Sequence, residues 1–418
     1  MNYYEEHRPE YLEELKEFLR IPSISTDPDH KDDIRKAAEF ALALLKKAGM
    51  DNTHLIEGEG NPLVYGEWLG AKGKPTLLLY GHYDVQPADP IDEWKSPPFE
   101  PEIRNDNIYA RGAVDDKGQT LILIKAVDGL MKQHGRLPVN VKFLLEGEEE
   151  VGGEHIESFV KSKPPLLKSD AAIICDTEMF APELPTLCVG LRGMVYGEIH
   201  VQGARQDLHS GIYGGAAPNP LQALAEIITT LKDKDGRIHI PGFYDKVEAP
   251  SAKEKEAWAR PTFEVHGIKG GFIGEGAKTV IPARAVAKIS TRLVAYQKPE
   301  EAIEQIRAAV NAACPKGVTV EFKVIHQAEP SLVNPDNHFI HVSAEAMKQS
   351  FGKDTVYIRS GGSIPIVGVF LDALGIPSVM MGFGLPDDNL HAPNEKFHLP
   401  NFYRGIEAVA KYLEMLGE

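Results

Sequence analysis

The sequence predicts an α/β fold in which a central mixed sheet is flanked by helices, with a ferredoxin-like α+β domain inserted into it. In the first part of the chain, short apolar runs without strict alternation are separated by helical stretches, as in a sheet covered on both faces. After Gly190 the expected order changes to β-α-β-β-α-β, and the first pattern returns near Ser331. At 418 residues the chain exceeds what one hydrophobic core usually holds, so two domains are expected.

The elements of the first part are read from hydrophobic periodicity. Apolar residues recur at helical spacing from Asp32 to Lys47, and Gly49 follows as a C-cap, which predicts a surface helix. Three apolar runs predict central strands: Thr76–Tyr80, Val139–Leu145 and Ala171–Cys175. Helices are expected between and after them, over Leu121–Met131 and Glu154–Lys161. This alternation of predicted strands and helices favours a layered α/β architecture.

The inserted domain is predicted from the order of its elements. The expected elements are a strand at Val195–Val201, a helix at Leu221–Leu231, strands at Val280–Ile281 and Ala285–Leu293, a helix at Pro299–Ala313 and a strand at Val318–Val324. A polar stretch, 233–278, interrupts the series without a readable pattern. The α/β pattern then resumes with a helix at His338–Ser350, a strand at Ser378–Met381 and a helix at Asn401–Met415. We therefore expect domain boundaries at 1–188, 189–327 and 328–418.

Charge and composition exclude several classes of protein. The formal net charge of −16 argues against a nucleic-acid partner, which would require clustered Lys and Arg. The N-terminus is charged and amphipathic, and no stretch approaches the roughly 20 apolar residues of a membrane span, so no membrane partner is expected. The three cysteines are not closely spaced, which favours reduced thiols. A cytoplasmic location is predicted.

Histidine and carboxylate residues follow the ends of several predicted strands. TLLLY runs into His82 and Asp84, VKFLL into Glu146 and the run Glu148 to Glu150, AAIIC into Asp176, and SVMM into a loop with His391. Asp115 and Asp116 precede another helix. Ligands of open α/β sheets bind beyond the carboxyl ends of strands, so these groups are expected at one edge. Imidazoles and carboxylates without thiolates suit zinc, cobalt or manganese.

Each of these patterns alone is more often structural than functional, because a His-x-Asp pair is usually hydrogen-bonded and a Glu run is usually solvated. Because the patterns occur together, a metal site becomes the better interpretation. Three consecutive Glu residues after a central strand bring like charges together, which is unfavourable unless a cation neutralises them.

Six segments together resemble the motif series of one metallopeptidase family. They are GHYDVQP, RGAVDDKGQ, LLEGEEEVGG, DLHSGIYGG, RSGGSIP and LHAPNE. In this order they resemble the zinc aminoacylase, glutamate carboxypeptidase and acetylornithine deacetylase family, and most closely its branch of cytosolic nonspecific dipeptidases and carnosinases. The resemblance covers nearly the whole chain. It implies a catalytic domain that binds metal and an inserted domain that serves as lid and dimerisation domain.

The resemblance implies two divalent metal ions per chain, with zinc preferred and manganese or cobalt as alternatives. One ion would be held by His82, Asp115 and Asp176. The second would be held by Asp115, Glu150 and His391, so that Asp115 bridges the two. A carboxylate can span two ions about 3.5–4 Å apart. Asp84 would orient the His82 imidazole and fix its tautomer, although a turn-forming Asp is the alternative.

The same resemblance makes Glu149 the general base, which takes a proton from water and passes it to the leaving nitrogen. Counting back from Gly152 and Gly153 selects Glu149 as the base and Glu150 as the ligand, and leaves Glu148 at the surface. A shift of these assignments by one residue stays open.

In the inserted domain the resemblance implies four substrate-binding residues. His209, in a glycine-rich polar loop, would polarise the scissile carbonyl. Arg292 would clamp the substrate carboxylate, and its alternative is a strand-face arginine in a salt bridge. Thr279 and Ser363 would complete the carboxylate pocket.

The expected reaction is hydrolysis of the amide bond of a dipeptide, or of a similar small substrate with a free C-terminal carboxylate, by hydroxide between the two metals. An N-acyl amino acid deacylase and a carboxypeptidase are the alternatives within the family. A non-catalytic metal-binding interaction protein is the alternative of another class; it would lack Glu149 or a ligand, and none is missing here. The expected partners are a small peptide substrate and a second copy of the chain, in a homodimer formed through the inserted domain.

Overall fold

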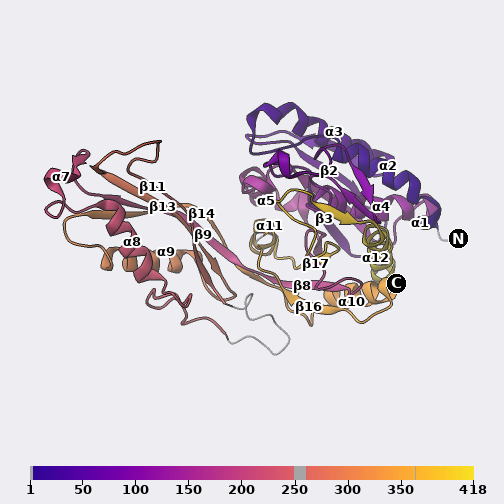
Figure 1. The fold of residues 1–418 in the computed structure, drawn as a ribbon. Helices are drawn as coiled ribbons and strands as arrows, with labels where there is room; N and C mark the ends of the chain where they lie inside the picture. The colour runs from indigo at the N-terminus through magenta and orange to yellow at the C-terminus, as the bar shows by residue number, and fades with distance from the viewer. Residues whose placement is uncertain (1–2, 249–259, 363) are drawn as a thin grey trace. The chain divides into compact units, whose positions relative to one another are not determined.

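The structure is a computed structural model that describes residues 3–248, 260–362 and 364–418. The chain divides into two units, one built from Met1–Val189, Val333–Ile358 and Ile364–Glu418, the other from Gly190–Leu332 and Arg359–Ser363 (Figure 1). The first unit thus contains both ends of the chain, and the second is inserted into it. No helix within the described residues has the length and apolar content needed to cross a membrane.

A mixed sheet forms the centre of the first unit. Its strands run in the order β1 (Asp51–Ile56), β2 (Leu63–Trp68), β6 (Asn140–Glu146), β3 (Thr76–His82), β7 (Ala171–Ile174), β17 (Ser378–Gly382) and β8 (Thr186–Leu191). Two short strands, β15 (Ser331–Leu332) and β16 (Val356–Arg359), also pair with β8. The β3, β6, β7 and β17 pairings are parallel, whereas β1, β2 and β8 join antiparallel. The predicted α/β fold is confirmed.

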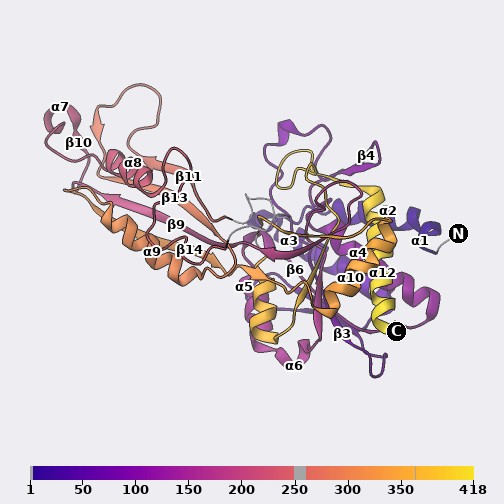
Figure 2. The same cartoon turned by 90° about the horizontal axis from the view of Figure 1, so that it is seen from below.

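The helices of the first unit cover this sheet. They are α1 (Tyr3–Glu6), α2 (Arg8–Leu19), α3 (Lys31–Lys47), α4 (Lys117–His134), α5 (Glu154–Ser162), α6 (Pro164–Leu167), α10 (His338–Phe351), α11 (Pro365–Val369) and α12 (Leu399–Gly417). Helix α12 lies between α10 and α4 and contacts both (Figures 1 and 2). Every residue of α4 from Lys117 to Leu130 is buried, and Gly135 ends the helix in the left-handed conformation that favours glycine.

The parallel strands bring the chemistry of the chain to one edge of the sheet. Strand β3 ends at His82 and lies in register with Glu146 at the end of β6. On the other side of β3, Tyr80 pairs with Ile174, so Cys175 and Asp176 leave β7 at the same edge. The candidate functional side chains therefore lie together at the carboxyl ends of these strands.

A second, three-stranded sheet braces the loops at this edge. It has the order β18-β5-β4, with β4 (Glu102–Arg104), β5 (Asn107–Tyr109) and β18 (Lys396–His398). Lys396 pairs with Tyr109 across it. The segments that lead to Asp115 and follow His391 are consequently held side by side.

The second unit has an antiparallel sheet in the order β11-β13-β9-β14. Its elements are β9 (Gly193–Gln202), α8 (Pro220–Leu231), β11 (Thr262–Gly270), β13 (Arg284–Leu293), α9 (Pro299–Ala312) and β14 (Thr319–Ala328). Helices α8 and α9 cover one face (Figure 1), where Leu224, Ile227 and Ile306 pack against Ile199 and Ile289 of the sheet. The predicted ferredoxin-like arrangement is confirmed.

One strand of this sheet was assigned wrongly from the sequence. The predicted strand at Val280–Ile281 exists as β12, but it pairs with β10 (Leu208–His209) in a separate two-stranded sheet. The edge position of the large sheet is filled by β11, from the polar stretch 233–278. Strand β11 is mostly exposed and therefore lacks the apolar pattern that marks an inner strand. Residues 249–259 of that stretch lie outside the described residues.

Candidate metal centre

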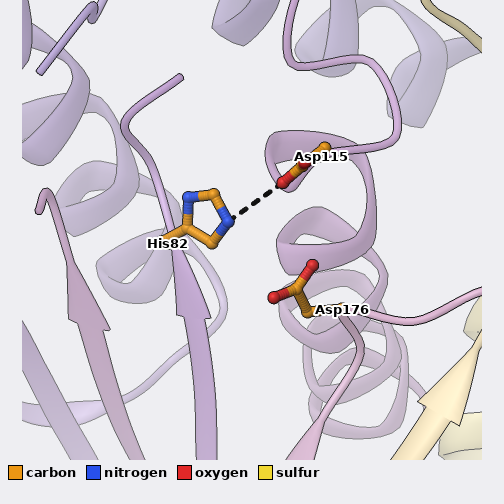
Figure 3. A group of neighbouring side chains, drawn as sticks. All are labelled: His82, Asp115 and Asp176. Carbon is orange, nitrogen blue, oxygen red and sulfur yellow. Dashed lines mark ion pairs between the residues drawn. The ribbon is translucent and has the colours of Figure 1, made fainter. Parts of the chain in front are cut away.

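The first group of possible ligands consists of His82, Asp115 and Asp176. Figure 3 shows their side chains directed toward one another, and their ligand atoms all lie within 4.8 Å. The Nε2 atom of His82 lies 3.2 Å from Oδ1 of Asp115. His82 is fully buried because it is the last residue of a central strand, so its orientation is set by the sheet.

The second group consists of Asp115, Glu150 and His391, again with ligand atoms within 4.8 Å of one another. The Nε2 atom of His391 lies 3.0 Å from Oδ2 of Asp115 and 3.3 Å from Oε2 of Glu150. Asp115 thus turns one carboxylate oxygen to each histidine. This is the arrangement that a carboxylate shared by two cations requires.

Asp84 connects the two groups. The Nδ1 atom of His82 lies 3.1 Å from the backbone oxygen of Asp84 and 3.3 Å from its Oδ1 atom. Since a carbonyl oxygen only accepts, Nδ1 carries the proton and Nε2 keeps its lone pair for a metal. The Asp84 carboxylate also accepts the backbone N–H groups of Glu149, at 3.3 Å, and Glu150, at 3.2 Å. Asp84 therefore fixes His82 and the glutamate run together.

The three consecutive glutamates point to different surroundings. Glu150 faces His391, and its Oε2 atom accepts a 2.8 Å hydrogen bond from Nε2 of Gln86. Burial raises the pKa of the Glu149 carboxyl well above its ordinary value, and the charges of Asp176 and Asp115 raise it further. Glu148, expected at the surface, accepts the Asn61 backbone N–H at 2.8 Å instead.

The electrostatics of the site favour a bound cation. Burial, followed by the charge of Asp115, raises the pKa of Glu150 to about 9, and burial also raises that of Asp176. Nε2 of His82 and Oε1 of Glu150 are buried without a hydrogen-bond partner. Carboxylates and neutral imidazoles suit zinc, manganese and cobalt, so these residues fit two divalent ions.

Several residues that shape the site received no role from the sequence. Glu146, buried at the end of β6, accepts a short hydrogen bond from the Tyr80 hydroxyl. Glu395 is buried and forms an ion pair with Arg111 at 2.7 Å. Two features of the sequence could have pointed to these residues: Glu146 ends an apolar run, and Glu395 is the last residue of the LHAPNE segment.

The predicted substrate-binding residues fall in the second unit. His209 is exposed, and its Nδ1 atom accepts the Gly211 backbone N–H at 3.0 Å at the start of α7 (Ser210–Tyr213). Thr279 lies beside it, since its carbonyl accepts the Ser210 N–H at 3.2 Å. Arg292 is partly buried in β13, which lowers the pKa of its guanidinium. Ser363 lies outside the described residues.

A mixed α/β sheet with a two-group imidazole and carboxylate centre, plus an inserted ferredoxin-like unit, defines the class of dinuclear metallohydrolases. Comparison with known families agrees: residues 78–415 match the model of peptidase family M20/M25/M40. The chain belongs to this family.

Individual relatives are similar over their full length. The chain is 31% identical to the Cys-Gly metallodipeptidase dug1 of Schizosaccharomyces pombe, covering 98% of this chain and 96% of the relative. It is also 31% identical to the Beta-Ala-His dipeptidase of Mus musculus, over 98% and 94% of the two chains. Among solved structures, the M20 family metallo-carboxypeptidase Sso-CP2 from Sulfolobus solfataricus superimposes with a TM-score of 0.87, at 33% identity over 98% and 99%.

The buried carboxyls predict how the stability of the metal-free protein depends on pH. Burial raises the pKa of Glu146 to about 8 and that of Glu150 to about 9, from an ordinary value of 4.5. Between about pH 5 and pH 7 the folded chain therefore keeps protons that the unfolded chain releases, so its stability should fall as pH rises. Thermal unfolding of chelator-treated protein measures this.

Added metal and the Glu146→Gln variant test whether the buried carboxyls cause this pH dependence. Zinc or manganese should remove the decline, because metal ions replace the retained protons. Glu146→Gln should make the metal-free decline shallower. A metal-free parent that is more stable at the higher pH would contradict the expectation.

Proposed function

We propose that this protein is a dinuclear metal-dependent dipeptidase that hydrolyses the peptide bond of dipeptides with a free C-terminal carboxylate. The observation that carries the proposal is the position of Asp115, whose two oxygens face His82 at 3.2 Å and His391 at 3.0 Å. The names of the S. pombe and mouse relatives, a Cys-Gly and a Beta-Ala-His dipeptidase, support this substrate class. The expected cytoplasmic location stays a prediction.

In this proposal His82, Asp115 and Asp176 hold one ion, and Asp115, Glu150 and His391 hold the other. Zinc is the preferred metal, with manganese or cobalt as alternatives, since imidazole and carboxylate ligands suit all three. The bound ions would supply Lewis acidity, polarising the scissile carbonyl and lowering the pKa of a water. Asp84 keeps the His82 imidazole in the ligating tautomer.

Glu149 is the proposed general base. The Asp84 carboxylate accepts its backbone N–H and that of the next residue, the proposed ligand Glu150. Burial raises the pKa of the Glu149 carboxyl, and the charges of Asp176 and Asp115 raise it further, as a group that takes up a proton requires. Glu149 would accept the proton of the attacking water and deliver it to the leaving nitrogen.

The glutamate assignments are tested by two isosteric changes. Glu149→Gln should keep both metals and lose about 10²–10⁴ in kcat, the usual range for a missing general base. Glu150→Gln should instead lower the metal content, because it removes a ligand. Metal analysis and steady-state kinetics of both variants measure this. Exchanged phenotypes would mean that the assignments are shifted by one residue.

The substrate carboxylate is the proposed partner of Arg292, with Thr279 and Ser363 completing the pocket. Arg292 suits this role because a guanidinium binds a carboxylate through two parallel hydrogen bonds. Its partial burial lowers the pKa of the guanidinium, and a bound carboxylate would favour the charged form. Thr279 lies beside the loop that carries His209.

A liberated-amine assay over a substrate panel distinguishes dipeptidase, carboxypeptidase and deacylase activity. The panel contains dipeptides, C-terminally amidated dipeptides, tripeptides and N-acetyl amino acids, each with zinc and with manganese. Dipeptides should be cleaved fastest, and amidation should raise KM strongly because Arg292 loses its partner. The carboxypeptidase alternative, favoured by the similarity to Sso-CP2, predicts faster cleavage of longer peptides.

Arg292→Ala identifies the residue that reads the carboxylate. It should weaken cleavage of free dipeptides much more than cleavage of amidated ones. Equal losses on both substrates would contradict a carboxylate clamp at this position.

We further propose that the second unit forms a homodimer and that His209 acts on the active site of the partner chain. Strand β11 is an edge strand of its sheet and exposes apolar side chains, with Val265 36% and Ile268 57% exposed. Such edges are paired or covered in stable proteins, and pairing around a two-fold axis would cover this one. The exposed loop of His209 suits a residue that enters a neighbouring site.

Mixing two inactive variants tests the proposed exchange of His209. His209→Ala should keep its metals and lose about 10²–10³ in kcat, as expected for a missing oxyanion donor. When it is mixed with Glu149→Gln under conditions that exchange subunits, one site of each heterodimer has both groups intact. Activity should then recover, to as much as half of the parent dimer. A demonstrated heterodimer without recovery would contradict action in trans.

A further inference from the structure

We infer that Glu395 is a positioning residue of the metal centre, which holds the backbone of Asp115 in place relative to His391. The inference rests on the proposed function, because it takes Asp115 and His391 as metal ligands. Glu395 is completely buried.

The Glu395 carboxylate organises the loop that carries Asp115. Its Oε1 atom accepts the backbone N–H groups of Val114, at 3.0 Å, and Asp115, at 3.2 Å. Its Oε2 atom accepts the N–H of Gly112 at 3.0 Å and a 2.7 Å hydrogen bond from Nη1 of Arg111. One side chain therefore satisfies three backbone donors of a single turn. The direction of the Asp115 side chain follows from that turn.

Glu395 belongs to the loop that carries His391. His391 has a left-handed backbone conformation with φ of 58°, which few residues other than glycine adopt. The loop is closed at its base, where Asp388 and Lys396 form a buried ion pair at 2.7 Å and a 3.0 Å backbone hydrogen bond. The surrounding structure thus fixes His391 in an unusual conformation, as is common at functional sites.

Arg111 extends the same network to the segment that follows the strand of His82. Its side chain is 1% exposed, and Nη2 donates to the backbone oxygen of Pro87 at 2.9 Å. Pro87 follows the segment in which Asp84 orients His82. The Arg111–Glu395 pair therefore links three separate segments, each of which contributes a ligand or its orienting group.

The negative charge of Glu395 is required by this geometry. All four groups that face its oxygens are donors, and only a carboxylate accepts on both oxygens. Glutamine has nearly the same shape, but its NH₂ group would face two of these donors without an acceptor. Glu395→Gln therefore removes two of the four positioning contacts while keeping the volume. Such supporting contacts commonly change metal affinity about 10–100-fold.

The test measures metal binding and not activity. Zinc is titrated into metal-free parent and variant proteins in competition with a chelator of known affinity. Folding is checked in parallel by circular dichroism. Parent protein should bind two equivalents, and folded Glu395→Gln should bind zinc about 10–100-fold more weakly. Parent-like affinity in folded Glu395→Gln would overturn the inference. A parent that binds no metal would overturn the proposed function itself.

A matched control separates positioning from general stability. Glu14 is also buried and charged, and it pairs with Lys47 at 2.6 Å and Lys125 at 2.5 Å, apart from the ligand-bearing segments. Glu14→Gln should lower the melting temperature and leave zinc affinity unchanged. An equal loss of affinity in this variant would contradict a positioning role for Glu395.

Arg111→Lys provides a second variant if Glu395→Gln does not fold. Lysine keeps the charge but cannot bind Glu395 and Pro87 in the same forked way, so zinc affinity should fall. Because the backbone contacts of Glu395 remain, the loss should be smaller than in a folded Glu395→Gln. Unchanged affinity in Arg111→Lys, without a folded Glu395→Gln to compare, would count against the network.

Discussion

Like charges buried at one edge of a sheet are the constraint on which this structure depends. The backbone brings the carboxylates of Asp84, Asp115 and Asp116 next to a buried His82, where water cannot screen their repulsion. Burial lowers the pKa of the Lys117 amine to about 7, but the charges of Asp84 and Glu395 raise it, so this amine supplies part of the compensation. Lys117 is buried and donates to the carbonyls of Phe18 and Ile21, at 3.1 Å and 2.6 Å. The remaining charge balance is left to the metal ions, so ligand binding and folding stability are linked.

The two units differ in how they support their candidate functional residues. In the first, the functional groups stand on buried parallel strands and on loops tied together by buried hydrogen bonds, which favours a fixed geometry for metal ions. In the second, His209 is the exposed end of a two-residue strand and is followed by a four-residue helix. Rigid support suits a metal centre, and an exposed position would suit the substrate contact proposed for His209.

The sequence predicted those parts of the fold that leave a local pattern. Strands β3, β6, β7 and β17 were found because both of their faces are buried and their residues are apolar. Strand β11 was missed because an exposed edge strand needs no apolar side chains. The role of Glu395 left no local pattern either, since its partner Gly112 lies 283 positions away and offers a backbone N–H that any residue would have. Motif order predicted the candidate ligands, but the contacts that orient them required coordinates.

The long separation between the proposed ligands of the second metal determines when this candidate site can be completed. Asp115 and His391 are 276 positions apart, and the whole inserted unit lies between them. During synthesis His82, Asp115 and Asp176 leave the ribosome long before His391, with the α12 sequence emerging after all of them. Since domains generally fold as the chain emerges, the inserted unit can fold while the surrounding sheet still lacks β17. The nascent chain therefore offers at most one complete candidate ligand group, and the second group can be completed only after the segment that carries His391 has been synthesised.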